Sequence, residues 1–566
     1  MLDDAVLIDA GGRREGALLI AGGEILAEMP AGSAWPDHLE VRDLDGAVVI
    51  PGLIDSHTHL YLSGATWWVG DTVAENLRAT LYWGVLGAMD VGAPEVLFSL
   101  RDRIDRGELL GPRIAATGPF LTAEGSHPCE VVNDRDLCVF VDGDGGEQAA
   151  RLAASGADWL KVALVDNDFS DWPTPRLDLG DLAEITAAGV PVVAHIAQGD
   201  DAADALAAGV TGLAHPVFAE PVAPEVAALP FLEIHSTLGA ANGVVALMDA
   251  DLDGPDYAAT AQATKIAWNY IQNHPEVLAE GWVEDNAGWT AQLRENLAVY
   301  QSEGAPVIAG SDAGYWFVPH GRALHDELAA MVDAGWSEVE ALAAATSEPA
   351  AALGWDDMGW IGAGYRAELV VLEADPLEDI ANTLRIRAVV LGGEWREQAS
   401  LLEVELRTEG GDTDFCLDDR DCEGACDLVD HLCVDACLDP YATDGDCGDE
   451  RWCMPADGLA GTAEGVCHAE ATCDWRAQDC APESYAETCA PLDLDTSACV
   501  ASGERQIFET CSWTDPGQAC SPGLLCSWVD YRCYELCEPG APDTCTLGSC
   551  NQEYASPGNP WFGLCY

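Results

Sequence analysis

The sequence predicts an α/β protein with strand-rich segments on either side of its main domain and a cysteine-rich C-terminal region. Three observations lead to this prediction. Residues 51–357 alternate apolar runs with alanine- and leucine-rich stretches, as parallel strand–helix units do. Residues 1–50 and 358–400 resemble short strands, and the first segment is broken by Gly11-Gly12 and Gly22-Gly23. Twenty of the 22 cysteines lie between Cys416 and Cys565.

Length and charge exclude several classes of protein. The chain has 566 residues, enough for two or three domains, and 49% of them are hydrophobic, so an ordinary core can form. Its net charge is −73, from 98 acidic and 25 basic residues. Nucleic-acid binding needs a basic surface, so we exclude it. No apolar span reaches 18 residues, which argues against an integral membrane protein.

The first candidate site lies in the motif Pro51-Gly-Leu-Ile-Asp-Ser-His57-Thr-His59. The apolar run Val48–Ile50 leads into it and is expected to be a buried strand. His57 and His59 are two residues apart, so on a strand they face the same way. At the carboxyl end of a barrel strand, two imidazoles make half of a metal site. The alternative is a surface turn that happens to contain two histidines.

Lys161 is unusual because it lies inside an apolar run, Asp158–Leu164, and the chain has only one other lysine, Lys265. A buried ammonium group is costly unless it is paired or neutralised. A neutral lysine amine can take up carbon dioxide to form a carbamate, which can bridge two cations. The alternative is a lysine whose amine reaches solvent.

Three more candidates also follow apolar runs. His195 and His215 are 20 residues apart, with an expected helix over residues 200–209 between them, so they occupy equivalent points of successive strand–helix units. Asp312 follows Pro306–Ala309 and has small neighbours that permit close approach. The alternatives are core histidines and a helix N-cap aspartate.

The segments that carry His57 and His59, Lys161, His195, His215 and Asp312, in this order along the chain, resemble the amidohydrolase superfamily of metal-dependent hydrolases. The resemblance covers about residues 1–400 and is greatest for the branch with imidazolonepropionase-like proteins and carbamylated-lysine Xaa-Pro dipeptidases. It also rests on Gly310–Gly314 and on Gly362–Leu372, which resembles the returning strand of the family with Glu368 in place of the usual aspartate. It implies a (β/α)8 TIM barrel over residues 51–357 and a small discontinuous β-sandwich formed by residues 1–50 and 358–400.

The resemblance also implies a metal centre with two divalent ions. The expected ligands are His57, His59 and Asp312 for the more buried ion, His195 and His215 for the second, and carbamylated Lys161 as the bridge. Imidazolonepropionase is mononuclear and lacks such a lysine, so Lys161 favours the binuclear branch. Zinc is the expected metal because the ligands are imidazoles and carboxylates, with manganese, cobalt or iron as alternatives.

The implied reaction is hydrolysis of a C–N bond by a hydroxide that bridges the two ions, because cations lower the pKa of bound water. Asp312 is expected to accept a proton from the water and pass it to the leaving nitrogen. The substrate is expected to be a small molecule such as an Xaa-Pro dipeptide, an N-acyl amino acid or a cyclic amide. His127, in Thr122–Pro128, is a candidate for contacting it, and His235 is a weaker one. His325 is expected to pack from a helix against the barrel.

Two alternative functions stay open. The same site could serve an esterase, a lactonase or a phosphotriesterase. The barrel could instead be catalytically retired within a secreted binding protein, although the full ligand set argues against that.

The C-terminal region, residues 416–566, is predicted to be disulfide-rich and mostly irregular or β, after a linker at 401–415. Cys426, Cys433 and Cys437 have the same spacing as Cys526, Cys533 and Cys537, which predicts two related modules. A zinc site is disfavoured because no Cys-x-x-Cys occurs. The cysteines predict an extracellular or cell-envelope protein, although the chain begins without a signal-like segment. The region is a candidate for binding a cell-surface or extracellular partner, and the oligomeric state stays open.

Overall fold

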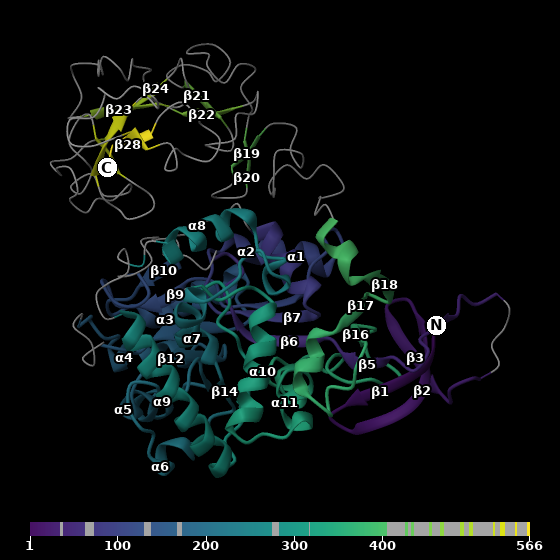
Figure 1. Ribbon diagram of the computed structural model, residues 1–566. Helices are drawn as coiled ribbons and strands as arrows, with labels where there is room; N and C mark the ends of the chain where they lie inside the picture. Colours follow the sequence, from purple (N-terminus) through teal and green to yellow (C-terminus); the bar gives the residue numbers. More distant parts are fainter. Residues whose placement is uncertain are drawn as a thin grey trace. The chain divides into compact units, whose positions relative to one another are not determined.

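The chain divides into two compact units, Met1–Leu406 and Arg407–Tyr566, which are described separately (Figure 1). The computed structural model describes residues 1–33, 38–62, 73–129, 137–166, 173–273, 275, 282–315 and 317–403, with short strands between residues 425 and 565. Of the expected linker, only residues 401–403 are described, and most of both cysteine modules lies outside the described residues.

One sheet of the first unit combines strands from both of its ends, in the order β18-β17-β16-β5-β1-β2-β3, with β4 paired to β1. Strand β5 pairs antiparallel with β16, so that Val49 lies opposite Val371. Leu7, Val49 and Val371 belong to one buried cluster, so the two ends share a core. The strands are β1 (Leu2–Asp9), β2 (Gly12–Ala21), β3 (Glu24–Met29), β4 (Arg42–Asp43), β5 (Val48–Pro51), β16 (Leu369–Leu372), β17 (Ile386–Leu391) and β18 (Glu394–Glu397).

Parallel strands form the centre of the unit, as an α/β fold requires. They make a seven-stranded sheet, β10-β9-β11-β12-β13-β14-β15, and a three-stranded sheet, β6-β7-β8. Most are buried on both faces, and most of their sequences are mainly apolar. They are β6 (Leu53–Thr58), β7 (Val85–Asp90), β8 (Arg113–Ala116), β9 (Phe120–Thr122), β10 (Cys138–Phe140), β11 (Leu160–Ala163), β12 (Val192–His195), β13 (Gly212–Leu213), β14 (Glu233–His235) and β15 (Val307–Ile308).

Backbone hydrogen bonds connect these two sheets at both edges. The Ser56 N–H donates to the Ala309 carbonyl at 3.0 Å, which places β6 beside the chain that follows β15. At the other edge, the Asp158 N–H donates to the Ala116 carbonyl at 2.9 Å. The arrangement is consistent with a TIM-barrel-like domain.

Helices surround the parallel strands (Figure 1). Helix α5 ends just before Gly209, whose φ of +93° suits glycine, and Ser337 and Glu340 form a capping box on α11. The helix expected at 200–209 is confirmed. The α-helices are α1 (Val73–Tyr82), α2 (Val96–Asp105), α3 (Gly145–Ser155), α4 (Leu179–Thr186), α5 (Gly199–Ala207), α6 (Pro224–Ala227), α7 (Leu238–Met248), α8 (Gln262–Asn273), α9 (Trp282–Glu303), α10 (Arg322–Ala334), α11 (Glu338–Ala344) and α12 (Ser347–Ala352). Short 3-10 helices are η3 (Pro255–Tyr257), η5 (Ile380–Leu384) and η6 (Gln398–Glu403).

The buried strand expected at Val48–Ile50 is confirmed, although it is not the strand that carries His57. This run is a buried strand, β5, but it belongs to the sheet formed by the two ends of the unit. The strand that carries His57 is β6, Leu53–Thr58, within the motif itself. The chain changes sheets at Gly52, whose N–H donates to the Glu368 carbonyl, while the Leu53 N–H donates to the Gly84 carbonyl.

The second unit is described only as short antiparallel strands. In five of its described strand pairs a cysteine lies opposite a cysteine in register. These strands are β19 (Ala425–Asp427), β20 (Leu432–Val434), β21 (Trp452–Pro455), β22 (Gly465–His468), β23 (Glu487–Pro491), β24 (Ser497–Ala501), β25 (Leu524–Cys526), β26 (Cys533–Cys537), β27 (Cys550–Asn551) and β28 (Gly563–Cys565). Across the described parts of both units, every helix is too short or too polar to cross a bilayer.

Candidate active site

The six predicted ligands come together around one cavity. They lie on or just after parallel strands β6, β11, β12, β13 and β15, at the carboxyl ends where such folds place their chemistry. His127 lines the same cavity, as does the aromatic ring of Phe120. The predicted ligands that line it are His57, His59, Lys161, His195, His215 and Asp312.

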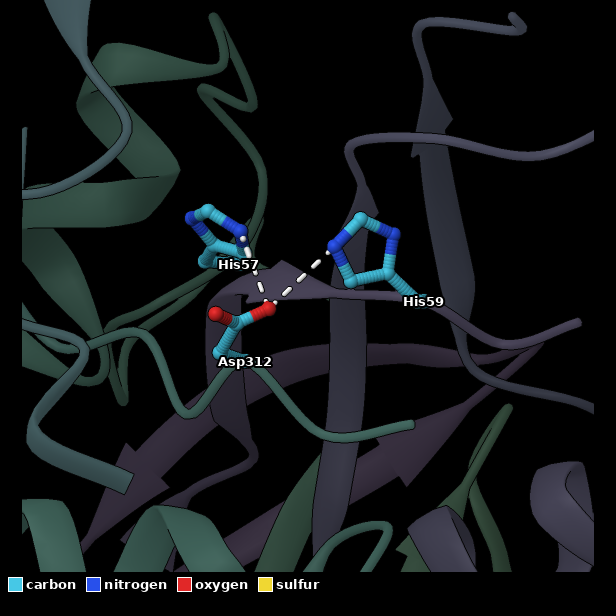
Figure 2. Close-up of side chains that lie close together, drawn as sticks. All are labelled: His57, His59 and Asp312. Atoms are coloured by element: carbon cyan, nitrogen blue, oxygen red, sulfur yellow. Dashed lines mark ion pairs between the residues drawn. The ribbon is translucent and has the colours of Figure 1, made fainter. Parts of the chain in front are cut away.

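His57, His59 and Asp312 form the tightest group, and both imidazoles point toward the carboxylate in Figure 2. Asp312 Oδ1 lies 3.3 Å from His57 Nε2 and 3.2 Å from His59 Nε2. One ligand atom from each residue lies within 4.8 Å of the other two, as a shared metal ion requires. A Cβ at Gly310 would lie 2.6 Å from the Cβ of His57, so only glycine allows this approach.

The second group lies beside the first. The ring of His215 is 4.6 Å from that of His195 and 4.9 Å from that of His57, measured between centroids. Among the described residues, a tight three-ligand cluster is found only for His57, His59 and Asp312. The structure therefore brings all six side chains to one cavity but groups only three of them closely.

Hydrogen bonds orient two of these imidazoles. Nδ1 of His59 lies 3.2 Å from the Gly92 carbonyl oxygen, and a proton on Nδ1 leaves Nε2 free for a metal ion. Nδ1 of His215 lies 2.8 Å from the hydroxyl oxygen of Thr237, and a proton on this Nδ1, donated to the hydroxyl, likewise leaves Nε2 free.

Burial prepares these groups for metal binding. It lowers the pKa of the His57 imidazole well below its ordinary value and that of His215 to about 3, so both rings are neutral at pH 7. Burial alone would raise the pKa of the Asp312 carboxyl, but the neighbouring imidazoles of His57 and His59 outweigh it and hold that pKa well below its usual range. Neutral imidazoles beside an ionised carboxylate are the protonation states of metal ligands.

The amine of Lys161 is fully enclosed. The residue is 1% exposed, and Nζ has no hydrogen-bond partner among the described residues. Burial lowers its pKa to about 7, although Asp312 and Asp90 act in the opposite direction. A large fraction of the amine is therefore neutral near pH 7, the form that reacts with carbon dioxide. Solvent access for this amine, the alternative considered above, does not occur.

Asp55 connects the first and last strands of the site, a role that the sequence does not reveal. Its carboxylate accepts hydrogen bonds from the Ser311 hydroxyl, from the Ser311 N–H at 2.9 Å and from the His57 N–H at 3.2 Å. Burial raises the pKa of this carboxyl to about 6. Asp55 thereby holds the backbones that carry His57 and Asp312 against each other.

Glu327 on α10 supports the turn that carries Thr237. Its carboxyl accepts a hydrogen bond from the Ser236 hydroxyl at 2.6 Å and contacts the Gly239 N–H. Thr237 lies between these two anchors and contacts His215. Glu327 is 1% exposed, and burial raises its pKa to about 8.

Glu327→Gln is expected to change how stability depends on pH. Between pH 4.5 and about 8 the folded protein keeps a proton on Glu327 that the unfolded chain releases, so this carboxyl makes stability fall as pH rises, by up to about 1.4 kcal/mol per pH unit. The glutamine variant lacks this contribution. Urea unfolding at pH 5, 6, 7 and 8 measures it, with the exposed Glu303→Gln as control, and equal slopes for Glu327→Gln and wild type would contradict the prediction.

A disulfide lies next to the segment that carries His127. Cys129 and Cys138 are bonded, with Cα atoms 6.5 Å apart, and their neighbours Pro128 and Leu137 line the cavity. The ring of His127 stacks on that of His195 at 4.2 Å. A covalent link therefore lies beside the part of the cavity lining that includes His127.

Replacing both Cys129 and Cys138 with serine is expected to lower the unfolding free energy by about 2–3 kcal/mol and to raise KM more than it lowers kcat. The unfolded loop gains entropy, and the edge of the cavity loses its link. Urea unfolding and steady-state kinetics test this. A variant with wild-type stability and KM would show that the disulfide has no part in holding this edge.

Two further histidines lie away from the cavity lining. His325 packs from α10, with Nε2 2.9 Å from the Trp83 carbonyl and Nδ1 2.9 Å from the Thr383 hydroxyl, so its predicted packing role is confirmed. His235, the weaker candidate for contacting substrate, is fully buried and does not line the cavity. It lies against His57, with ring centroids 5.4 Å apart.

The outer walls of the cavity are mainly apolar, and sequence reasoning did not find them. Trp289, Leu293 and Asn286 come from α9, and the ring of Phe218 lies 6.0 Å from that of Trp289. Apolar residues of a long helix give no local signal that separates a pocket wall from ordinary core packing.

Comparisons with known proteins identify the family and the fold. A model of the amidohydrolase family matches residues 48–396. An uncharacterized protein of Mycobacterium bovis is 29% identical over 335 residues, which cover 56% of this chain and 75% of that protein. A structure of a prolidase complexed with N-methylphosphonate-L-proline has a TM-score of 0.56 at 22% identity, covering 70% of this chain and 98% of that one. A Xaa-Pro dipeptidase with bound methionine has the same TM-score and identity, covering 70% of this chain and 99% of that one. At these identities the structural likeness shows the fold alone.

Proposed function

The chain belongs to the amidohydrolase family, and from this premise we propose that it is a metal-dependent enzyme that hydrolyses a C–N bond in a small amide or dipeptide-like molecule. One observation carries the proposal. Lys161 Nζ is buried in the cavity without a hydrogen-bond partner in the part of the chain that the structure describes, and beside it His57 Nε2 and Asp312 Oδ1 face each other at 3.3 Å without hydrogen-bond geometry. Buried polar atoms are costly without partners, and a shared metal centre would supply them.

The donor set fits two divalent ions, for which zinc is our proposal. His57, His59 and Asp312 would hold one ion, His195 and His215 the second, and Lys161 would bridge them as a carbamate. The support is the neutral state of the buried imidazoles and the pKa of about 7 for Lys161. Bound ions would lower the pKa of a water molecule and polarise the substrate carbonyl.

The side chains around this centre would manage protons and orientation. Asp312, ionised and buried, would accept a proton from the attacking water and deliver it to the leaving nitrogen. His127 lines the same cavity next to His195, so it would orient the substrate carbonyl or leaving group. The hydrogen bonds that join the two parallel sheets support a closed (β/α)8 barrel as the frame.

The walls of the cavity favour a substrate with an apolar side group. Phe218, Trp289 and Leu293 form one side, and Leu62 and Phe120 form others. Xaa-Pro dipeptides, N-acyl amino acids and cyclic amides all combine a scissile C–N bond with such a group. The prolidase and Xaa-Pro dipeptidase names of similar structures support the first class.

Metal analysis together with a substrate panel tests the proposal. Protein prepared in an oxidising compartment with bicarbonate should contain about two divalent ions per chain and hydrolyse at least one of the three amide classes. Esters, lactones and phosphotriesters in the same panel test the alternative reactions. Metal-free protein after reconstitution, or binding of the amides without turnover, would point to the retired barrel.

Trp289→Ala is expected to raise KM about tenfold for a substrate with an aromatic or branched side group and to change kcat little. The indole forms part of the wall, and loss of such a contact costs about 1–2 kcal/mol of binding without touching the reacting atoms. A substrate series from glycyl to phenylalanyl amides measures this. An equal loss for all side groups would contradict the assignment of Trp289 to specificity.

We also propose that the protein works in an oxidising compartment, outside the cell or in its envelope. The Cys129–Cys138 disulfide supports this, because such bonds rarely persist in a reducing cytosol. Thiol counting on protein fractionated from its native source tests it, and free thiols at both positions would contradict it.

A further inference from the structure

A carboxylate and an imidazole lie buried behind the first metal ligand, outside the cavity. Glu233 and His235 are two apart on β14 and so face the same way, and they are 1% and 0% exposed. Oε1 of Glu233 lies 3.4 Å from Nε2 of His235, and Nδ1 of His235 lies 3.3 Å from Nδ1 of His57. On its other side His57 presents Nε2 to Asp312.

Proton counting along this chain allows one consistent arrangement. If His57 binds a metal ion through Nε2, its own proton lies on Nδ1, which then donates to Nδ1 of His235. His235 must therefore carry its proton on Nε2, where the Glu233 carboxylate accepts it. Protons on both nitrogens of His235 would set two N–H donors against each other at 3.3 Å.

The strand beside Glu233 leaves room for the carboxylate. Gly212 on β13 lies opposite Glu233 in register, and a Cβ at this glycine would come within 2.6 Å of Cγ of Glu233. The other carboxylate oxygen of Glu233, Oε2, has no hydrogen-bond partner among the described residues. A buried carboxylate with so few partners is destabilising, which argues that it is kept for a role other than packing.

We propose that Glu233 and His235 are positioning residues that act through His57. They set the tautomer of His57, hold its ring and increase its basicity toward the metal ion, and neither touches substrate. The inference rests on the proposed metal-dependent function, because His57 must be a ligand for the chain to matter.

Competition with a chromogenic zinc chelator tests the proposal on the full-length protein. Glu233→Gln and His235→Gln should each lose the His57 ion about 10- to 100-fold more readily than wild type. The double variant should be no worse than His235→Gln alone, since Glu233 reaches His57 only through His235. Glu368→Gln, which neutralises a buried carboxylate in the other sheet, is the matched control and should bind zinc as wild type does.

The outcomes separate this proposal from the proposed function. Wild-type affinity in Glu233→Gln and His235→Gln, or losses that simply add in the double variant, would overturn the inference while leaving the enzyme metal-dependent. Unfolding curves identify a variant that has merely lost its fold. If Glu233→Gln is such a variant, Glu233→Asp replaces it, and Glu233→Asp is expected to keep part of the wild-type zinc affinity. If wild type binds zinc but hydrolyses no amide, the proposed reaction fails and the chelator result still decides this inference. If wild type binds no metal, both fail.

Discussion

Asp312→Asn is expected to lower kcat/KM for the best substrate of the panel by about 10⁴-fold. The substitution removes the buried charge that faces both His57 and His59, and with it the group proposed to transfer the proton between water and leaving nitrogen. The amide has nearly the same shape as the carboxylate, so the backbone around Gly310 need not move. Steady-state kinetics and metal content, measured on the same preparation, test the prediction.

The control for Asp312→Asn is Glu368→Gln, the loss of another buried carboxyl far along the chain, which should keep wild-type kcat/KM. A melting temperature for Asp312→Asn close to that of wild type would show that the fold is retained. If this variant kept a tenth or more of wild-type activity, Asp312 could not have its proposed role.

Lys161→Ala is expected to lose about one ion per chain and to lower kcat/KM about 10³-fold or more. The variant lacks the amine whose burial and pKa of about 7 favour carbamate formation, so the proposed bridge between two ions cannot form. Elemental analysis and kinetics on protein prepared with bicarbonate measure both effects. Lys265→Ala removes the only other lysine and should change neither.

Rescue by small carboxylic acids provides a second test of the role of Lys161. The deleted side chain leaves space in which formate or acetate can sit, so millimolar amounts should restore part of the metal content and activity of Lys161→Ala. Full activity in Lys161→Ala without added acid would exclude a bridging carbamate. Two bound ions per chain in Lys161→Ala would also exclude a bridging carbamate.

The residues of the site could be predicted because each follows a local signal. His57, His195 and Asp312 come just after or within apolar runs, and parallel strand–helix units bring such points to one end of a domain. Lys161 was found because a lone lysine in an apolar run is physically costly. None of these inferences required knowledge of distant contacts.

The residues that support the site, Asp55 and Glu327, could not be predicted because their partners lie far away in the sequence. Asp55 is 256 residues from Ser311, and Glu327 is 91 residues from Ser236, so no periodicity or short spacing links the partners. Val48–Ile50 forms the buried strand that was expected, but the sequence did not show that a separate strand, β6, carries His57, because a buried strand of either sheet is an apolar run. His235 follows such a run as well, yet it contacts His57 and does not line the cavity.

The contacts of Asp55 and Ser56 with Ser311 and Ala309 have a consequence for how the protein is made. They join the first parallel strand of the domain to the last, more than 250 residues later, at the point where His57 meets Asp312. During synthesis the ribosome must therefore release the chain past Asp312 before these ligands can meet. Activity should appear only in nascent chains that extend past Asp312. The chain length at which it appears would show when the whole domain closes.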